Sequence, residues 1–420
     1  MTPAARLQAG IEILDALLAS RAPAEKALKT WGAAHRFAGS GDRRAIAERV
    51  YACLRHGQVA KNGRGLVAAS LTLDDRLEPE AINALFSGQA HGPAPLSDEE
   101  IAALKALTPG TVQMGSYIEG QLARTFGKAW PAEARSLMQD RAPLDIRINL
   151  AVSYPVAVQA RLADLGLEAA PTPFAAAGLR LAGGVDVQAL DIFKEGGFEV
   201  QDEGSQLVAA LCAVRPGDLV VDYCAGGGGK TLALAANLKG GRLIACDIDD
   251  RRLAAIAPRL KRAGVKAELR KIGSRGESLD DLNRAADRVL VDAPCSGSGT
   301  WRRHPEGAWR ITPDEINRLA ALQLKILTQA ANLIKPGGIL AYVTCSVLAS
   351  ENSAVVERFE ARNQGFAPLP IATALAHTGA AITPSGREQL TALAKAHQLQ
   401  LSPGRTGTDG FFIALFERRP

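Results

Sequence analysis

Two cysteines and an aspartate each follow an apolar run that is typical of a buried strand. The segment DAPCSGSGT (292–300) contains Asp292 and Cys295, and the segment TCS (344–346) contains Cys345. The carboxyl ends of parallel strands meet at one edge of a sheet, where ligands bind. We therefore expect the two thiols and the carboxylate to lie close together there, although a free cysteine is more often a small buried hydrophobe.

Two thiols beside a carboxylate suit one kind of group transfer. The C5 atom of a pyrimidine is a poor nucleophile, but a thiolate that adds to C6 makes C5 enamine-like, so that it can attack an electrophilic methyl group. Loss of the C5 proton and elimination of the thiol then restore the ring, which divides one hard step into easier ones. The thiol must be partly ionised, which nearby Lys or Arg favours. Asp292 can hydrogen-bond the N3/N4 edge of a cytosine that has left its stack.

The third motif, VVDYCAGGGGKT (220–231), joins an apolar run to four glycines and Lys-Thr. A phosphate-binding loop of an ATPase would need glycine where Cys224 stands, and the dinucleotide pattern G-x-G-x-x-G fits no register through 226–229. Glycines still let a ligand approach the backbone, and the following helix offers N–H groups to a carboxylate. The next strand ends in Asp247, which can bind ribose hydroxyls. A ligand with ribose, adenine and a carboxylate but no phosphate is S-adenosylmethionine; the alternative is a tight structural turn.

Alternating strand and helix signals position these motifs from about residue 201 to the end. A helix is expected over 230–238, a basic helix ends near Gly264, and Thr312 and Pro313 introduce a long amphipathic helix. The pattern predicts an α/β fold with a doubly wound, mostly parallel, Rossmann-like sheet. Its expected strands are 218–224, 242–249, 265–272, 287–294, 339–346 and 411–417.

The residues before this domain form two further parts. Leu7, Ile11 and Leu14 repeat at helical spacing, and Asp42 is expected to cap a helix that runs to His56. Short apolar pieces then alternate with one helical stretch. We expect three domains: an all-helical domain over 1–140, a small α/β subdomain over 141–200 and the catalytic domain over 201–420.

Composition excludes several classes of protein. The 420 residues include six cysteines without a CxxC pair, which favours neither a metal site nor a disulfide framework. No apolar run could span a bilayer and no secretory signal is evident, so we expect a cytoplasmic protein without a membrane partner. Residues 1–64 hold 11 Lys/Arg against 5 Asp/Glu, more than the whole net charge of +5. This surplus indicates either a surface for a polyanion or a solvated helical face.

Taken together, the motifs resemble the Sun/Nol/Nop family of RNA (cytosine-5) methyltransferases, and most closely its bacterial members that act on 16S rRNA. The likeness covers nearly the whole chain, and the order and spacing of the two cysteine motifs make it specific. The stretch at 40–56 is similar to the NusB-like RNA-binding domain of those members. The matching segments are SGDRRAIAERVYACLRH (40–56), FEVQDEGSQLVA (198–209), VVDYCAGGGGKT (220–231), DAPCSGSGTWRRHPEGAW (292–309), YVTCSVLASEN (342–352) and TGTDGFFIALFERR (406–419).

The resemblance implies a role for each site residue. Cys345 would be the nucleophile, Cys295 would assist release of the methylated product, and Lys230 would support the loop and Asp292. Asp247 would hold the ribose of S-adenosyl-L-methionine, and Asp292 would lie where cofactor and base meet. The backbone that lines the methionine moiety would be that of Cys224, Ala225, Gly226, Gly227, Gly228, Gly229 and Lys230.

The sequence also departs from the family pattern and leaves alternatives open. The family loop CAAPGGK reads CAGGGGK here, and LRKIGSRGE (269–277) lacks the aspartate expected after the third strand. In DNA cytosine-5 methyltransferases the cysteine that follows proline attacks, which would make Cys295 the nucleophile. The expected partner is RNA, most simply rRNA and not DNA, bound by a monomer; tRNA as the substrate, or an inactive RNA-binding scaffold, are the alternatives.

The basic and aromatic residues after the first cysteine motif have two interpretations each. Arg302, Arg303 and His304 could bind RNA phosphates or form a solvated loop. Trp301 and Trp309 could stack on a base or belong to a core.

Overall fold

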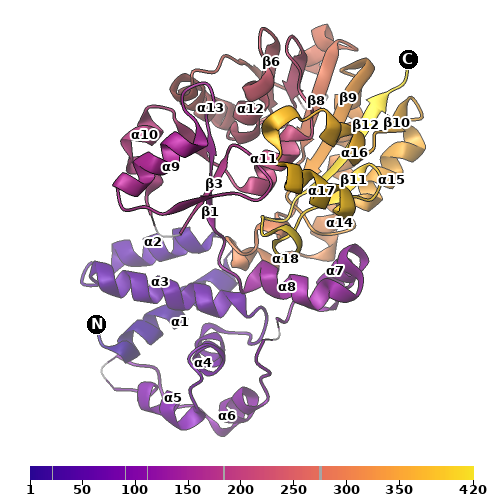
Figure 1. The fold of residues 1–420 in the computed structure, drawn as a ribbon. Helices are drawn as coiled ribbons and strands as arrows, with labels where there is room; N and C mark the ends of the chain where they lie inside the picture. The colour runs from indigo at the N-terminus through magenta and orange to yellow at the C-terminus, as the bar shows by residue number, and fades with distance from the viewer. Residues whose placement is uncertain (21, 90, 111, 183–184, 274–276) are drawn as a thin grey trace. The chain divides into compact units, whose positions relative to one another are not determined.

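The computed structural model describes residues 1–420 except 21, 90, 111, 183–184 and 274–276, and it divides into two compact units (Figure 1). The first unit contains Met1–Arg141 and Thr300–Thr312, and the second contains Ala142–Gly299 and Pro313–Pro420. The segment that follows the first cysteine motif therefore belongs with the N-terminal helices. None of the helices in the described part of the chain has the length and apolar composition that a bilayer crossing requires.

The first unit is built of helices around an apolar core. Leu14, Val50, Cys53 and Leu66 are completely buried in it, at the helical spacing that the sequence shows. The helices are α1 (Pro3–Ala19), α2 (Ala24–Ala34), α3 (Ser40–Arg55), α4 (Gly63–Leu73), α5 (Pro79–Leu85), α6 (Asp98–Lys105), α7 (Ser116–Phe126) and α8 (Trp130–Met138).

Asp42 does not cap α3, contrary to the expectation. The helix begins at Ser40 after Gly39, so Asp42 lies in the first turn, where its carboxylate accepts a hydrogen bond from the Gly39 N–H at 3.2 Å. The same carboxylate accepts from Arg6 Nε at 2.8 Å. An acid in the first turn still stabilises the helix, because it binds a free N–H group and opposes the helix dipole.

Residues 300–312 are anchored among the helices of the first unit. Ala24 N–H donates to Glu306 Oε1 at 3.1 Å, and Trp309 Nε1 donates to the Leu54 carbonyl at 3.1 Å. Trp301 is only 1% exposed, so the structure favours its interpretation as a core residue. Arg302 is also buried, so it is not part of a solvated basic loop.

The second unit begins with an antiparallel sheet in the order β2-β3-β1-β4, packed on short helices. The chain order β-α-β-β-α-β is that of a ferredoxin-like subdomain. Ile146, Val158, Leu179 and Phe198 form its core. Its elements are β1 (Leu144–Ile148), α9 (Pro155–Asp164), β2 (Ala169–Pro171), β3 (Gly178–Leu181), α10 (Asp191–Lys194) and β4 (Phe198–Val200).

A larger sheet follows, with the strand order β10-β12-β9-β8-β5-β6-β7 and β11 paired to β12. The ladder from β7 through β9 is parallel, and β12 runs antiparallel to β9. Its strands are β5 (Leu219–Asp222), β6 (Arg242–Asp247), β7 (Glu268–Lys271), β8 (Ala286–Asp292), β9 (Ile334–Thr344), β10 (Phe366–Pro368), β11 (Gln398–Gln400) and β12 (Phe412–Arg418).

Helices cover both faces of this sheet, as a doubly wound fold requires (Figure 1). Successive strand residues point to opposite faces, so Val221 joins the core beneath α14 and α15, while Val220 joins the core beneath α11. The predicted fold class is thereby confirmed. The helices are α11 (Glu203–Ala210), α12 (Gly229–Leu234), α13 (Asp250–Ala263), α14 (Pro313–Ala331), α15 (Ser353–Arg362), α16 (Ile371–Ala376), α17 (Pro384–Leu393) and α18 (Pro403–Thr406).

The strand order reverses at β5. The chain goes from β5 to β6 and β7 on one side and then crosses to β8 and β9 on the other. Ligands of such sheets bind outside the carboxyl ends of the strands at this reversal. The loops after β5 and β8 carry the glycine motif and the first cysteine motif.

Candidate active site

The glycine loop between β5 and α12 depends on the conformational freedom of its glycines. Gly226 and Gly228 have φ angles of 52° and 80°, which residues with a Cβ rarely adopt. A Cβ on Gly228 would lie 2.9 Å from Ile256 Cγ2, whereas one on Gly226 would have no described atom within 4 Å. The backbone at Gly226 therefore borders open space, and a ligand can approach it.

The first residues of the loop are held by the strand next to it. Ala225 N–H donates to the Cys246 carbonyl at 2.8 Å, and the Cys224 side chain packs against the core of the second unit. Burial raises the pKa of the Cys224 thiol well above its ordinary value. This cysteine is therefore a neutral thiol.

The carboxylate of Asp247, at the end of β6, is tied to the glycine loop. Its Oδ2 accepts from Gly226 N–H at 2.9 Å, and its Oδ1 accepts from Asp249 N–H at 2.9 Å. Each carboxylate oxygen can accept about two hydrogen bonds, so both oxygens keep capacity for a hydroxyl group. Ile248, the next residue, is 60% exposed. The sequence did not identify this exposed apolar side chain, which lies beside the predicted ribose site.

Lys230 joins the glycine loop to the end of β8. Its Nζ lies 2.7 Å from Asp292 Oδ2 and 4.9 Å from the centre of the Phe411 ring. Burial alone would lower the pKa of Lys230, but the negative charges of Asp292 and then Cys345 outweigh it and raise that pKa. Lys230 is therefore a fixed cation beside both residues.

The two predicted cysteines meet at the carboxyl edge of the sheet. Cys295 Sγ lies 3.4 Å from Cys345 Sγ, within reach of a sulfur hydrogen bond. Backbone bonds hold the two loops together, since Gly299 N–H donates to the Cys345 carbonyl at 3.0 Å and Ala293 N–H donates to the Val343 carbonyl at 2.9 Å. The sulfurs of two residues separated by 50 positions in the sequence therefore lie side by side.

The surroundings make the two sulfurs unequal. The hydrogen bond with Cys345, and then burial, raise the pKa of Cys295 well above its ordinary value, and the charge of Glu351 acts in the same direction. The Cys295 thiol is therefore held in its protonated form beside Cys345.

Glu351 connects the two cysteine loops, a connection that the sequence did not reveal. Its side chain is completely buried. Oε1 accepts from Ser296 N–H at 2.8 Å and from Gln323 Nε2 at 3.0 Å, while Oε2 accepts from the Ser296 and Ser346 hydroxyls at 2.5 and 2.6 Å. An acid among the small and apolar residues after Cys345 was the available signal.

Two further contacts of the glycine loop could not be predicted from the sequence. The Arg259 guanidinium donates to the Gly227 carbonyl, and Gln201 Nε2 donates to the Gly229 carbonyl at 3.3 Å. Both residues lie outside the glycine motif, on α13 and before α11. The sequence lacks the aspartate that the family pattern has after the third strand, here β7. Residues 274–276 of that segment lie outside the described part of the chain.

Comparisons with known proteins agree with this arrangement. Residues 209–417 match the family model described as 16S rRNA methyltransferase RsmB/F, and residues 121–188 match the ferredoxin-like domain of RsmF/B-like methyltransferases. A curated relative from Salmonella arizonae, named ribosomal RNA small subunit methyltransferase B, is 34% identical over 298 residues. That match covers 70% of this chain and 65% of the relative, so the chain spans about two thirds of the relative's length.

Two solved structures share the fold. The crystal structure of PH0851 superimposes with a TM-score of 0.73 at 24% identity and covers 98% of this chain and 99% of that one. A methyltransferase homolog protein from Pyrococcus horikoshii has a TM-score of 0.58 at 26% identity and covers 72% of this chain and 95% of that one. On the two family models, whose matches include both the ferredoxin-like subdomain and the cysteine site, the chain belongs to the RsmB/F family of methyltransferases.

Proposed function

We propose that the protein transfers a methyl group from S-adenosylmethionine to C5 of a cytosine in small-subunit ribosomal RNA. The observation that carries the proposal is the 3.4 Å separation of Cys295 Sγ and Cys345 Sγ beside the Lys230–Asp292 pair. Addition of a thiolate to C6 and its later elimination need such a pair next to a hydrogen-bonding carboxylate.

The residues around the glycine loop fit S-adenosylmethionine. The open space at Gly226 admits a ligand to the backbone, Asp247 has acceptor capacity for ribose hydroxyls, and Ile248 offers an exposed apolar surface to adenine. Asp292 lies at the end of the neighbouring strand, between the loop and Cys295. When bound, S-adenosylmethionine supplies an electrophilic methyl group.

Cys345 is the nucleophile in this proposal. The Lys230 cation and the Cys295 donor stabilise its thiolate, which adds to C6 of the cytosine and forms the S–C6 bond. Asp292 is 28% exposed in its side chain and can hydrogen-bond the N3/N4 edge of the base. Once C5 carries the methyl group, a base such as water would take the C5 proton, the electrons of the C5–H bond would restore the C5=C6 double bond, and the S–C6 bond would break with its electron pair returning to the Cys345 thiolate.

Cys295 assists the release step. Its raised pKa keeps it protonated beside Cys345, so it can donate a hydrogen bond to the sulfur that leaves C6. The opposite assignment, with Cys295 as the nucleophile, would place the thiolate near Glu351, whose negative charge raises the pKa of Cys295 and so disfavours it.

The choice of ribosomal RNA follows the relatives, whose names specify the small ribosomal subunit. Transfer RNA is the alternative substrate. The basic surplus of residues 1–64 is compatible with either polyanion.

Methyl transfer to small-subunit rRNA and to tRNA, followed by bisulfite sequencing, tests the proposal. Cys345→Ser should lose both turnover and covalent RNA adducts, because no thiolate attacks C6. Cys295→Ser should form an adduct that persists under denaturing electrophoresis. If Cys345→Ser still forms adducts, or if the wild-type protein methylates a different base, the proposed mechanism is wrong.

A further inference from the structure

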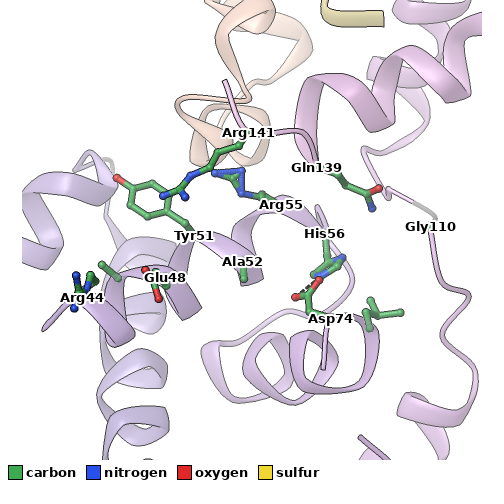
Figure 2. A pocket seen from close by; sticks show the side chains of 12 residues that line it. Arg44, Glu48, Tyr51, Ala52, Arg55, His56, Asp74, Gly110, Gln139 and Arg141 are labelled. Carbon is green, nitrogen blue, oxygen red and sulfur yellow. Dashed lines mark hydrogen bonds and ion pairs between the residues drawn. The ribbon is translucent and has the colours of Figure 1, made fainter. Parts of the chain in front are cut away.

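A cavity of about 700 Å³ lies in the first unit, and its lining residues are not those of the methyl-transfer site (Figure 2). It is bounded by one side of α3, the end of α4 and the residues after α8. The polar side chains that matter here are Arg44, Tyr51, Arg55, His56, Gln139 and Arg141.

Arg55 lies in the wall of this cavity and forms no ion pair among the residues that the structure describes, although the charge of Asp74 acts on it from a distance. Its Nη1 atom is buried and has no hydrogen-bond partner among the residues that the structure describes. Burial, and then the nearby charge of Arg141, lower the pKa of Arg55. Figure 2 shows Arg141 and Arg55 extending into the same part of the cavity. Two like charges this close repel each other, and an anion bound between the two guanidinium groups would remove that repulsion.

The acids around the cavity do not neutralise this pair. Asp74 Oδ2 is bound to His56 Nε2 at 2.9 Å and to the Ser70 hydroxyl at 2.7 Å. Glu48 is an exposed residue of the wall. Within the described part of the chain, neither Arg55 nor Arg141 forms an ion pair with either acid. Arg44 adds a third cation at the exposed side.

We propose that this cavity binds a phosphodiester group of the RNA substrate between Arg55 and Arg141, with the adjoining nucleotide against Tyr51. A guanidinium fork matches the oxygens of a phosphate, and two forks facing one another can share one phosphate. The half-buried ring of Tyr51 offers an aromatic surface next to them, and Gln139 offers an amide for hydrogen bonding. The proposal rests on the proposed function, which supplies the RNA.

Nucleic acid fits the site better than an acidic peptide does. The same helical segment carries the basic surplus of the chain, which favours a polyanion of high charge density. A peptide carboxylate would leave the aromatic wall without a partner, whereas a nucleotide has both a phosphate and a flat base.

The test compares full-length variants in their binding of a small-subunit rRNA transcript at several KCl concentrations. Arg55→Gln and Arg141→Gln should each weaken binding about tenfold, which is the loss of one charged hydrogen bond. Each should also reduce the slope of log affinity against log salt by roughly 0.7 to 0.9, the value for one phosphate contact. Arg358→Gln, at an exposed arginine that lies outside residues 1–64 and does not line the cavity, is the matched control and should change affinity less than twofold.

Thermal unfolding separates a binding role from a structural one. Because Arg55 Nη1 has no partner in the described chain and Arg55 faces Arg141, Arg55→Gln should leave the melting temperature unchanged or raise it. Arg55→Lys should restore part of the salt slope. The inference is overturned if Arg55→Gln binds RNA as Arg358→Gln does, or if its weaker binding merely follows a lowered melting temperature.

Separate outcomes refute this inference and the proposed function. Arg55-dependent RNA binding without cytosine methylation would refute the proposed function alone. Normal methylation with RNA binding that does not depend on Arg55 would overturn the cavity alone. Cys345→Ser should keep the full RNA affinity and salt slope, because the cavity lies outside the reacting residues.

Discussion

Replacement of Glu351 should separate the stability of the site from its chemistry. Its carboxylate accepts four hydrogen bonds, from Ser296 N–H, the hydroxyls of Ser296 and Ser346, and the Gln323 amide. These bonds join the loop of Cys295 to the loop of Cys345. Glu351 touches neither sulfur through a hydrogen bond, so it acts as a positioning residue.

The loss of folding stability in each variant depends on which of these donors can find another acceptor. In Glu351→Ala the two hydroxyls can turn elsewhere, since Ser346 Oγ already lies 2.9 Å from Ser298 Oγ. The Gln323 amide keeps its bond to the Pro294 carbonyl at 3.0 Å. The Ser296 N–H has no such second acceptor, and one buried donor without a partner costs about 1–3 kcal/mol. Glu351→Gln keeps an oxygen for these two donors and offers its new amide to the hydroxyls. Its cost should be about 1.5 kcal/mol, the loss of the charge.

Thermal unfolding and single-turnover methyl transfer measure the two effects. Displacement of a reacting group by about 1 Å costs about 100-fold in rate, so Glu351→Ala should lose about 100-fold at a temperature where it remains folded, and Glu351→Gln about tenfold or less. The control is Glu357→Gln, an exposed acid on α15. A Glu351→Ala protein that melts and reacts like this control would refute the network as the connection between the sulfurs.

Two more predictions concern buried ionisable groups. Burial raises the pKa of Asp222 from 3.8 to about 7 in the folded protein. Because the folded protein binds this proton more tightly than the unfolded chain does, the protonated carboxyl contributes its full stabilisation below pH 3.8. That contribution is lost as the pH rises through about 7. Asp222→Asn should gain stability over wild type, by roughly 3 kcal/mol more at pH 8 than at pH 5 in urea unfolding. Diamide should oxidise Cys295 and Cys345 to a disulfide, because their sulfurs are 3.4 Å apart and a bond needs about 2 Å. Methyl transfer should then stop until dithiothreitol is added, as assayed before and after reduction. A stability gain for Asp222→Asn that is equal at pH 5 and pH 8 would contradict the first prediction. The second would be contradicted if diamide inactivated the folded Cys295→Ser protein, which cannot form this disulfide, as strongly as it inactivates the wild-type protein.

Several features of the fold and the site could be predicted from local patterns. Apolar runs ending in Asp247, Asp292 and Cys345 predict parallel strands, and the edge rule for such sheets then brings their ends together. The structure has this sheet, and it places the two sulfurs in contact. Four glycines before Lys230 also predict a loop with positive φ angles, which Gly226 and Gly228 adopt.

Other features depend on which surfaces pack together. The sequence could not show that residues 300–312 join the N-terminal helices, that Glu351 holds both cysteine loops, or that Arg55 faces Arg141 in a cavity. The position of Asp42 could not be predicted either. An aspartate indicated that a helix starts nearby, but the helix begins after Gly39, so that Asp42 lies in its first turn.

By itself, then, the sequence determined the fold class, the main strands of the larger sheet and the strand ends that carry the chemistry, because hydrophobic period and glycine geometry act over a few residues. Only the tertiary structure decided the exact ends of several elements, which distant side chains meet, and where an arginine is left without a partner among the described residues. Those contacts depend on packing between segments up to hundreds of residues apart, and no local pattern encodes them.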